Sequence, residues 1–101
     1  MLEHMLARVN AARAALKLSP LTELPKGQRN RSCDCVIARA LGVRTDVNSI
    51  AVEYGEEWKV KAIAQAWNLA YHGGRWIYLP PDIQSFINEF DAGLIPELID
   101  A

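Results

Sequence analysis

The stretch VRTDVNSIAVEY, residues 43–54, decides the fold, because it can belong either to a β-hairpin or to the second helix of a helix-turn-helix. Its apolar and β-branched residues occupy every second position in two runs: Val43, Thr45 and Val47, then Ile50, Val52 and Tyr54. A period of two is typical of β-strands, and Asn48-Ser49 between the runs suits a tight turn. We therefore predict a β-hairpin over residues 43–54.

Upstream of this stretch the apolar residues follow helical spacing. An amphipathic helix is predicted over residues 1–18, ended by Pro20, from the spacing of Leu2, Leu6, Val9, Ala12 and Leu16. A long polar loop with two prolines follows it. Ser32 is a suitable N-cap for a second helix over residues 33–41, and Gly42 suits the left-handed position after its last turn.

Downstream, a third helix is predicted to begin at Glu56-Glu57 and to end at His72-Gly73-Gly74, with a strand over residues 75–79 after it. A fourth helix begins at Pro81 and ends at Gly93, and its buried face consists of Ile83, Phe86, Ile87 and Phe90. The order α-α-β-β-α-β-α predicts an α+β fold, with a small antiparallel or mixed sheet of about three short strands and about four helices. The strand order stays open, and one alternative is a right-handed parallel crossover over residues 50–79.

The size and composition of the chain are those of one globular domain. It has 101 residues, of which 50% are hydrophobic and 23% are charged, so residues 1–101 are expected to form a single unit. Neither a secretory signal nor an apolar run long enough to span a membrane is visible. These features predict a cytoplasmic protein whose two cysteines are reduced.

The net charge of −1 conceals two halves of opposite sign. Residues 1–44 contain eight Lys or Arg and three acids, a charge of +5, whereas residues 45–101 contain three and nine, a charge of −6. Such polarity can create a basic face for an anionic partner. It can equally bring the two halves together in the fold, and the sequence leaves both interpretations open.

Two cysteines one residue apart, Cys33 and Cys35, raise the question of a metal or redox site. The strong zinc signature is two spaced pairs of ligands, whereas this chain has one pair and two isolated histidines, His4 and His72. A disulfide across one intervening residue would be strained. We predict no metal and no cofactor, with one thiol packed in the core and the other facing a loop or solvent.

DNA binding is the alternative that the segment IARALGV, residues 37–43, suggests. It resembles the first helix and turn of a bacterial helix-turn-helix, and Arg39 and Arg44 would suit phosphate contacts. The apolar anchor of the recognition helix, however, should stand where this chain has Asn48. The acidic second half would also repel DNA unless it is turned away.

Three blocks of the chain resemble a family of small uncharacterised proteins from actinobacteria and their phages. These blocks are CDCVIARALG, AIAQAWN and LPPDIQSFINEFDAGLIPELID, residues 33–42, 62–68 and 79–100. The resemblance implies a small intracellular bacterial or phage-derived protein. It implies neither an activity nor any site residue, although a phage origin favours binding to a host protein.

No motif for nucleophilic, phosphate-binding or metal-dependent catalysis occurs in the sequence, so we predict that the protein is not an enzyme. Aromatic residues outside the predicted apolar stripes and the arginines around the second helix favour a binding surface instead. We predict a non-enzymatic binding or regulatory module that acts on a macromolecular partner, in the first place a protein, with a helix-turn-helix-like DNA-binding regulator as the alternative. The predicted partner-binding residues are Arg29, Arg31, Arg39, Arg44, Trp58 and Trp76.

Overall fold

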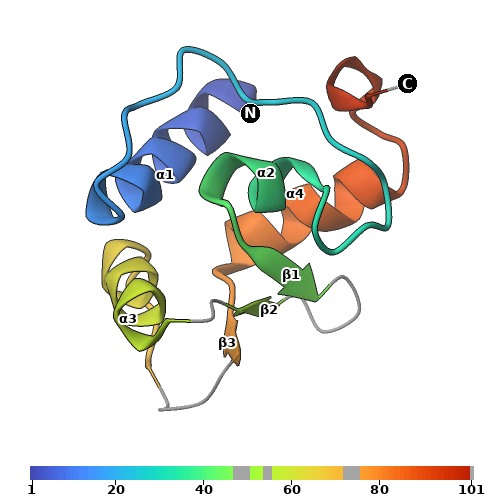
Figure 1. Cartoon of the computed structure of the whole chain (residues 1–101). Helices are drawn as coiled ribbons and strands as arrows, with labels where there is room; N and C mark the ends of the chain where they lie inside the picture. The colour runs from blue at the N-terminus through green and yellow to red at the C-terminus, as the bar shows by residue number, and fades with distance from the viewer. Residues whose placement is uncertain (47–50, 54–55, 72–75, 101) are drawn as a thin grey trace.

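The computed structural model describes residues 1–46, 51–53, 56–71 and 76–100, and within these ranges the elements follow the predicted order. These ranges contain four α-helices, three short strands and a final 3-10 turn, whose arrangement Figure 1 shows. Their bounds are α1 Leu2–Ala15, α2 Val36–Leu41, β1 Arg44–Asp46, β2 Ala51–Glu53, α3 Glu57–Ala66, β3 Trp76–Tyr78, α4 Pro81–Asp91 and η1 Pro96–Leu98.

The predicted α+β class is wrong, because the chain is mostly helical. The helices contain 14, 6, 10 and 11 residues, whereas each strand contains three. The helices also pack chiefly on one another, with α1 against both α2 and α3. Strands of three residues expose too little surface to form a layer on which helices pack, so helix–helix contacts organise this fold.

The strands pair antiparallel in the order β1-β2-β3. The alternative of a parallel crossover over residues 50–79 is therefore wrong. Between residues 43 and 54 the described part is extended, as the period of two predicts, and it contains no recognition helix. The predicted turn at Asn48-Ser49 lies outside the described residues.

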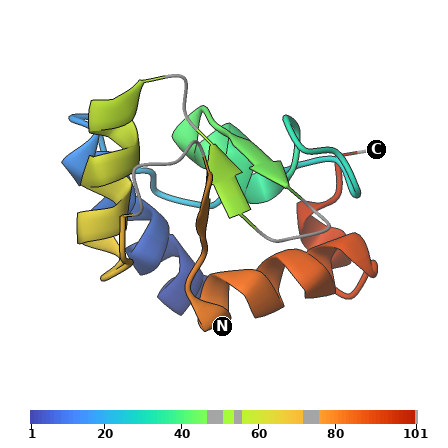
Figure 2. The same cartoon turned by 90° about the horizontal axis from the view of Figure 1, so that it is seen from below.

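One face of these strands belongs to the core and the other faces outward. Thr45, Val52 and Ile77 are paired across the three strands and are fully buried. Trp76 and Tyr78, on either side of Ile77, are exposed. Seen from below, α2 lies behind β1 and β2, and no helix of the described chain covers them in front (Figure 2). The outward face carrying Arg44, Trp76 and Tyr78 is called the open face below.

Helix α2 begins three residues later than predicted. Its N-cap is Cys35, whose Sγ accepts a hydrogen bond from the Ala38 amide at 3.4 Å, and Ser32 is not the cap. The preceding residues form turns instead, in which the Asp34 and Cys35 amides both donate to the Arg31 carbonyl. At the other end Gly42 has φ +66°, which confirms the predicted left-handed ending.

The C-terminal segment is fixed to the long loop before α2 by the backbone of Gly27. The Gly27 amide donates to the Leu98 carbonyl at 2.8 Å, and the Gly27 carbonyl accepts from the Asp100 amide at 2.9 Å. On its other side Gly27 lies against the start of α2, where a Cβ would stand 2.5 Å from the Val36 nitrogen. Only glycine fits between the two segments. We call this arrangement the Gly27 clamp.

A charged contact joins α1 to the first turn of α4, and Figure 2 shows the beginnings of the two helices close together. Arg8 on α1 donates through Nε to Asp82 Oδ2 at 2.9 Å, and His4 Nε2 lies 3.0 Å from the same oxygen. Asp82 stands in the first turn of α4, where a negative charge also suits the helix dipole. Partial burial opposes its ionisation, but the hydrogen bonds from Arg8 and His4 outweigh burial and lower the pKa of Asp82.

The Gly27 clamp predicts an uneven response to two glycine substitutions. We expect Gly27→Ala to lower the free energy of unfolding by about 2–3 kcal/mol, because the new methyl group must displace backbone atoms. Gly42→Ala is the matched control: no atom lies within 4 Å of its added Cβ, and its positive φ alone should cost about 1–2 kcal/mol. Urea unfolding measures both values. Equal losses in the two variants would contradict the clamp.

The lowered pKa of Asp82 predicts a pH-dependent effect of Asp82→Asn. A carboxylate with a depressed pKa stabilises the fold above its ordinary pKa, and this contribution is lost as the pH falls through the depressed value. We expect the variant to be less stable at pH 7 by up to about 1 kcal/mol, since the ion pair is partly exposed. The difference should begin to shrink below the ordinary value of 3.8 and disappear once the pH is below the depressed value. Glu89→Gln on the same helix also removes one carboxylate, but it leaves the contact with Arg8 and His4 intact, so it serves as the control for the loss of a charge.

Candidate functional site

The six predicted partner-binding residues do not gather on one surface. Arg29 and Arg39 make intramolecular contacts with the C-terminal third of the chain. Arg31 is exposed in the turn before α2, and Trp58 is exposed in the first turn of α3. The structure brings together only the Arg44 and Trp76 side chains.

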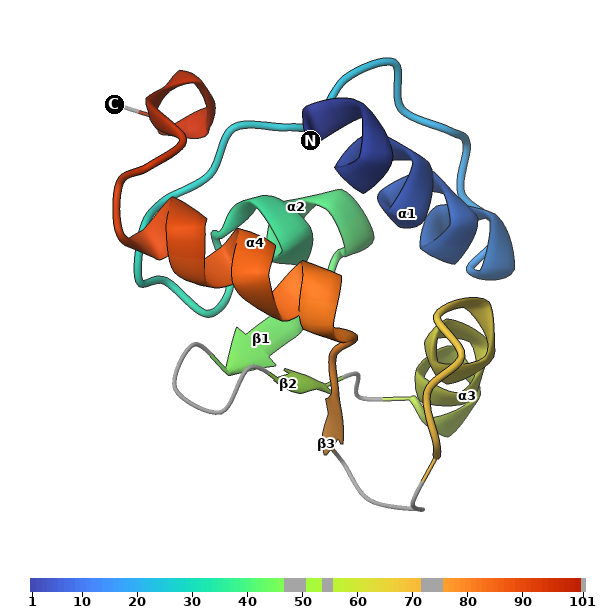
Figure 3. The same cartoon turned by 180° about the vertical axis from the view of Figure 1, so that it is seen from behind.

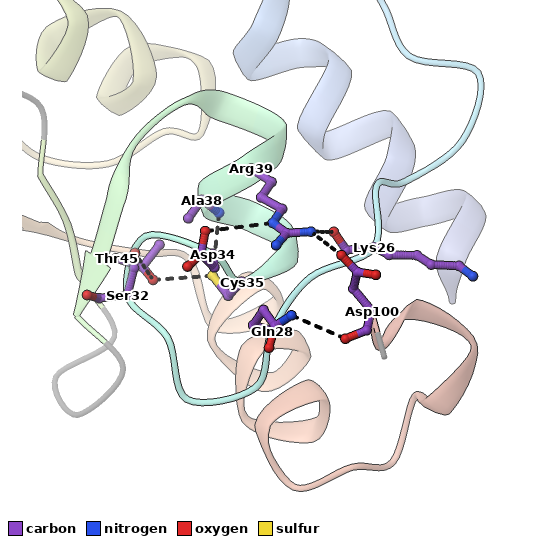
Figure 4. Close-up of polar contacts among 9 residues, drawn as sticks. All are labelled: Lys26, Gln28, Ser32, Asp34, Cys35, Ala38, Arg39, Thr45 and Asp100. Atoms are coloured by element: carbon purple, nitrogen blue, oxygen red, sulfur yellow. Dashed lines mark hydrogen bonds and ion pairs between the residues drawn. The ribbon is translucent and has the colours of Figure 1, made fainter.

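Arg39 holds the C-terminal segment against the long loop (Figure 4). Its Nη1 donates to the Lys26 carbonyl at 3.0 Å and to Asp100 Oδ2 at 2.9 Å, and its Nε lies 3.9 Å from Asp34 Oδ1. Gln28 adds a hydrogen bond from Nε2 to the Asp100 carbonyl at 3.3 Å. These contacts join a base of the positive half to acids of both halves, and they leave Arg39 fewer donors for an external anion.

Arg29 has a similar role at the end of α4. Its Nε donates to the Asp91 carbonyl at 2.8 Å, and its guanidinium lies against Gly93. The next residue, Asn30, donates its amide to Asp91 Oδ1 at 2.9 Å. Both contacts fix the loop before α2 to the end of α4, whereas the ion pairs that join the oppositely charged halves are Arg8–Asp82 and Arg39–Asp100.

Arg44 and Trp76 meet because of the strand register. Both residues pair with residue 53 of the central strand, so they occupy one row of the sheet, two strands apart. The Arg44 guanidinium carbon stands 5.8 Å from the centroid of the Trp76 ring. This distance is within the range of a cation–π interaction, which fixes the orientation of an otherwise exposed ring.

Tyr78 belongs to the same surface but was not among the predicted site residues. Its side chain is 68% exposed, and Trp76, two residues earlier on the same strand face, is 36% exposed. The alternation within residues 75–79 places both rings on one side. This alternation could not show which side of the strand faces the core, because apolar residues stand on both sides.

Trp58 is a second exposed aromatic residue with polar neighbours. Its side chain is 50% exposed, and its Nε1 donates to Glu56 Oε2 at 2.7 Å. The Lys59 Nζ lies 5.8 Å from its ring centroid. Trp58 thus lies outside the core, in agreement with its position off the apolar stripe of α3.

The two cysteines have different environments, as predicted. Cys33 is exposed, whereas Cys35 is buried at the start of α2 with its Sγ 3.3 Å from Thr45 Oγ1. Burial raises the pKa of Cys35, although the hydrogen bonds from Thr45 and Ala38 oppose this effect. Since the thiolate is the form that attacks substrates and binds metals, Cys35 is suited to a structural role as a cap.

The ranges that the structure describes contain no candidate metal site, because no three residues among His, Cys, Asp and Glu lie close enough together there to hold a metal ion. His72 and Arg75 lie outside these ranges, and the absence of a metal site stays a prediction. Among the described helices, none combines the length and apolar character required to cross a bilayer.

Comparison with models of protein families, with curated proteins and with solved structures gives no match to this chain. The resemblance to small actinobacterial and phage proteins therefore stays a prediction. The function has to be argued from the open face and from the surface chemistry around it.

The raised pKa of Cys35 predicts an alkaline loss of stability that depends on this residue. The unfolded thiol ionises near pH 9.0 and the buried thiol resists ionisation, so its contribution is complete below pH 9.0 and declines as the pH rises further. Relative to Cys35→Ser, we expect the wild-type chain to lose up to about 1.4 kcal/mol per pH unit in this range.

Urea unfolding between pH 7 and 10.5 in the presence of reductant measures this difference. Cys33→Ser is the matched control, because it removes the neighbouring exposed thiol, and it should follow the wild-type curve. Parallel curves for the wild-type chain and Cys35→Ser would show that the buried thiol does not contribute as described.

Proposed function

We propose that this protein is a non-enzymatic binding module whose open face contacts another protein. The observation that carries the proposal is the exposure of Trp76 and Tyr78 on either side of the fully buried Ile77. The partner is expected to place apolar side chains on these two rings. The strands present the rings, and the helices behind them supply the rigid core.

The composition of the open face supports a protein partner. A solvated face of an antiparallel sheet ordinarily carries polar residues, and isolated exposed hydrophobic residues need no explanation. Here Trp, Tyr and Arg occur together within strands of three residues. These three residue types dominate the binding energy of protein interfaces, because they combine large apolar surfaces with hydrogen-bonding groups.

The Arg44–Trp76 contact adds preorganisation. A side chain that is held in place before binding loses less conformational entropy when the partner arrives. The 5.8 Å distance between guanidinium and ring supports such an arrangement in the free protein. Arg44 thereby contributes to binding through Trp76 as well as through its own charge.

No feature of the described residues favours the DNA-binding alternative as the exposed aromatic residues favour a protein partner. The described part of residues 43–54 is extended, and the Arg29 and Arg39 side chains make contacts within the protein. Random duplex DNA is therefore a control ligand in the test below.

The proposal is tested by quantitative affinity capture from a lysate of actinobacterial cells, the source that the sequence resemblance implies. We compare the wild-type chain, the double variant Trp76→Ala/Tyr78→Ala and the control Leu94→Ala, which removes a 69% exposed side chain elsewhere. The recovered amount of a protein bound through the open face should fall at least about ten-fold with the double variant, since each hot-spot residue contributes at least about 2 kcal/mol. The recovered amount should be unchanged with the control.

Thermal unfolding of all three chains verifies that the variants are folded. Equal recovery of every captured protein by the three chains would contradict the proposal. Capture that nuclease treatment abolishes, together with salt-dependent binding of random duplex DNA, would favour the nucleic-acid alternative instead.

A further inference from the structure

A second surface lies at the other end of the molecule from the sheet. Leu2 and Leu6 of α1, Leu24 of the long loop and Leu98 of η1 line a mostly apolar hollow of about 330 Å³, which we call the leucine groove. In Figures 1 and 3 the start of α1 and η1 lie at the opposite end from the strands. The groove is therefore independent of the open face and of the function proposed for it.

The rim of the leucine groove is acidic. Glu3, Glu23 and Glu97 come from three separate segments and line the hollow together with the leucines. All three are exposed, and within the described residues none of them forms an ion pair. Lys26 lines an adjoining hollow that shares Glu23 and Glu97 with the groove, but it is not among the residues that line the groove itself.

Hydrogen bonds hold two walls of the groove in place. On the loop side, the Asn10 side chain donates to the Leu21 carbonyl at 3.0 Å and accepts from the Leu21 amide at 2.8 Å. On the side of η1, the Leu98 carbonyl accepts from the Gly27 amide at 2.8 Å. The groove thus exists before any ligand arrives, which lowers the entropic cost of binding.

We propose that the leucine groove binds a short segment of a partner protein in which apolar side chains stand next to lysine or arginine. The volume is at the lower end of the range for ligand sites, so it accommodates a few side chains rather than a whole helix. The leucines provide the apolar contact. The three rim carboxylates attract and orient a cationic segment and oppose an anionic one.

The test is a titration of the isotope-labelled full chain, followed by amide chemical shifts. The probe is a short capped peptide of leucine and lysine. Two matched peptides separate the contributions: one has glycine in place of leucine, and the other has glutamate in place of lysine. We expect saturable shifts only with the leucine–lysine peptide, centred on residues 2–6, 22–24 and 97–98, and an affinity that falls with added salt.

A charge variant connects the affinity to the rim. Glu3→Gln/Glu23→Gln/Glu97→Gln should weaken binding of the leucine–lysine peptide about five- to ten-fold, the sum of three exposed charge contacts. Glu89→Gln on α4 is the matched control and should bind as the wild-type chain does. Because glutamine is nearly isosteric with glutamate, both variants are expected to fold, and their amide spectra verify this.

Several outcomes would overturn the proposal: no saturable shift with the leucine–lysine peptide, equal binding of the glutamate peptide, or unchanged affinity in the triple variant. Shifts confined to Trp76 and Tyr78 would place the peptide on the open face and would also refute the groove as its site. Loss of the open-face function leaves all these readouts unaffected, so the two proposals fail separately.

Discussion

The arrangement of this protein depends on one close approach, that of the Gly27 backbone to the start of α2. A side chain at this position would collide with the backbone of residues 34–36, so the loop can pass this close to α2 only if position 27 is glycine. The opposite side of Gly27 pairs with the C-terminal segment around Ile99. The same loop then reaches β1, where the Ser32 carbonyl accepts from the Thr45 amide at 2.7 Å. The clamp thereby connects the wall of the leucine groove to the edge of the sheet.

Local sequence patterns predict the elements of this fold because their signals are local. The change from helical spacing to a period of two locates the strands, and the apolar face of the fourth helix is buried as predicted. The fold class could not be predicted in this way, since it depends on how long each strand is paired. The second helix begins later than predicted because the Gln28 backbone amide donates a hydrogen bond to the Asp34 carbonyl across the loop. This contact outweighs the local preference of Ser32 for the N-cap position.

The candidate surfaces were harder to predict, because their residues are distant in the sequence. Arg29 and Arg39 look available along the chain, yet their partners Asp91 and Asp100 lie 62 and 61 residues away. Conversely, the pairing of Arg44 with Trp76 follows from a register that the sequence left open. The leucine groove has no local signal at all, since three segments contribute to it. The charge asymmetry along the chain left open whether the two halves attract each other, and it could not name the ion pairs that join them.

Native-state amide hydrogen exchange at Gly27 and Asp100 tests the central claim, that the clamp holds loop, second helix and C-terminal segment as one unit. Both amides donate to backbone carbonyls of the opposite segment. If the clamp is part of the cooperative core, they exchange only through global unfolding, at the rate of core amides such as that of Val43. Exchange of both amides at the rate of an unprotected loop, while the Val43 amide stays protected, would contradict the clamp.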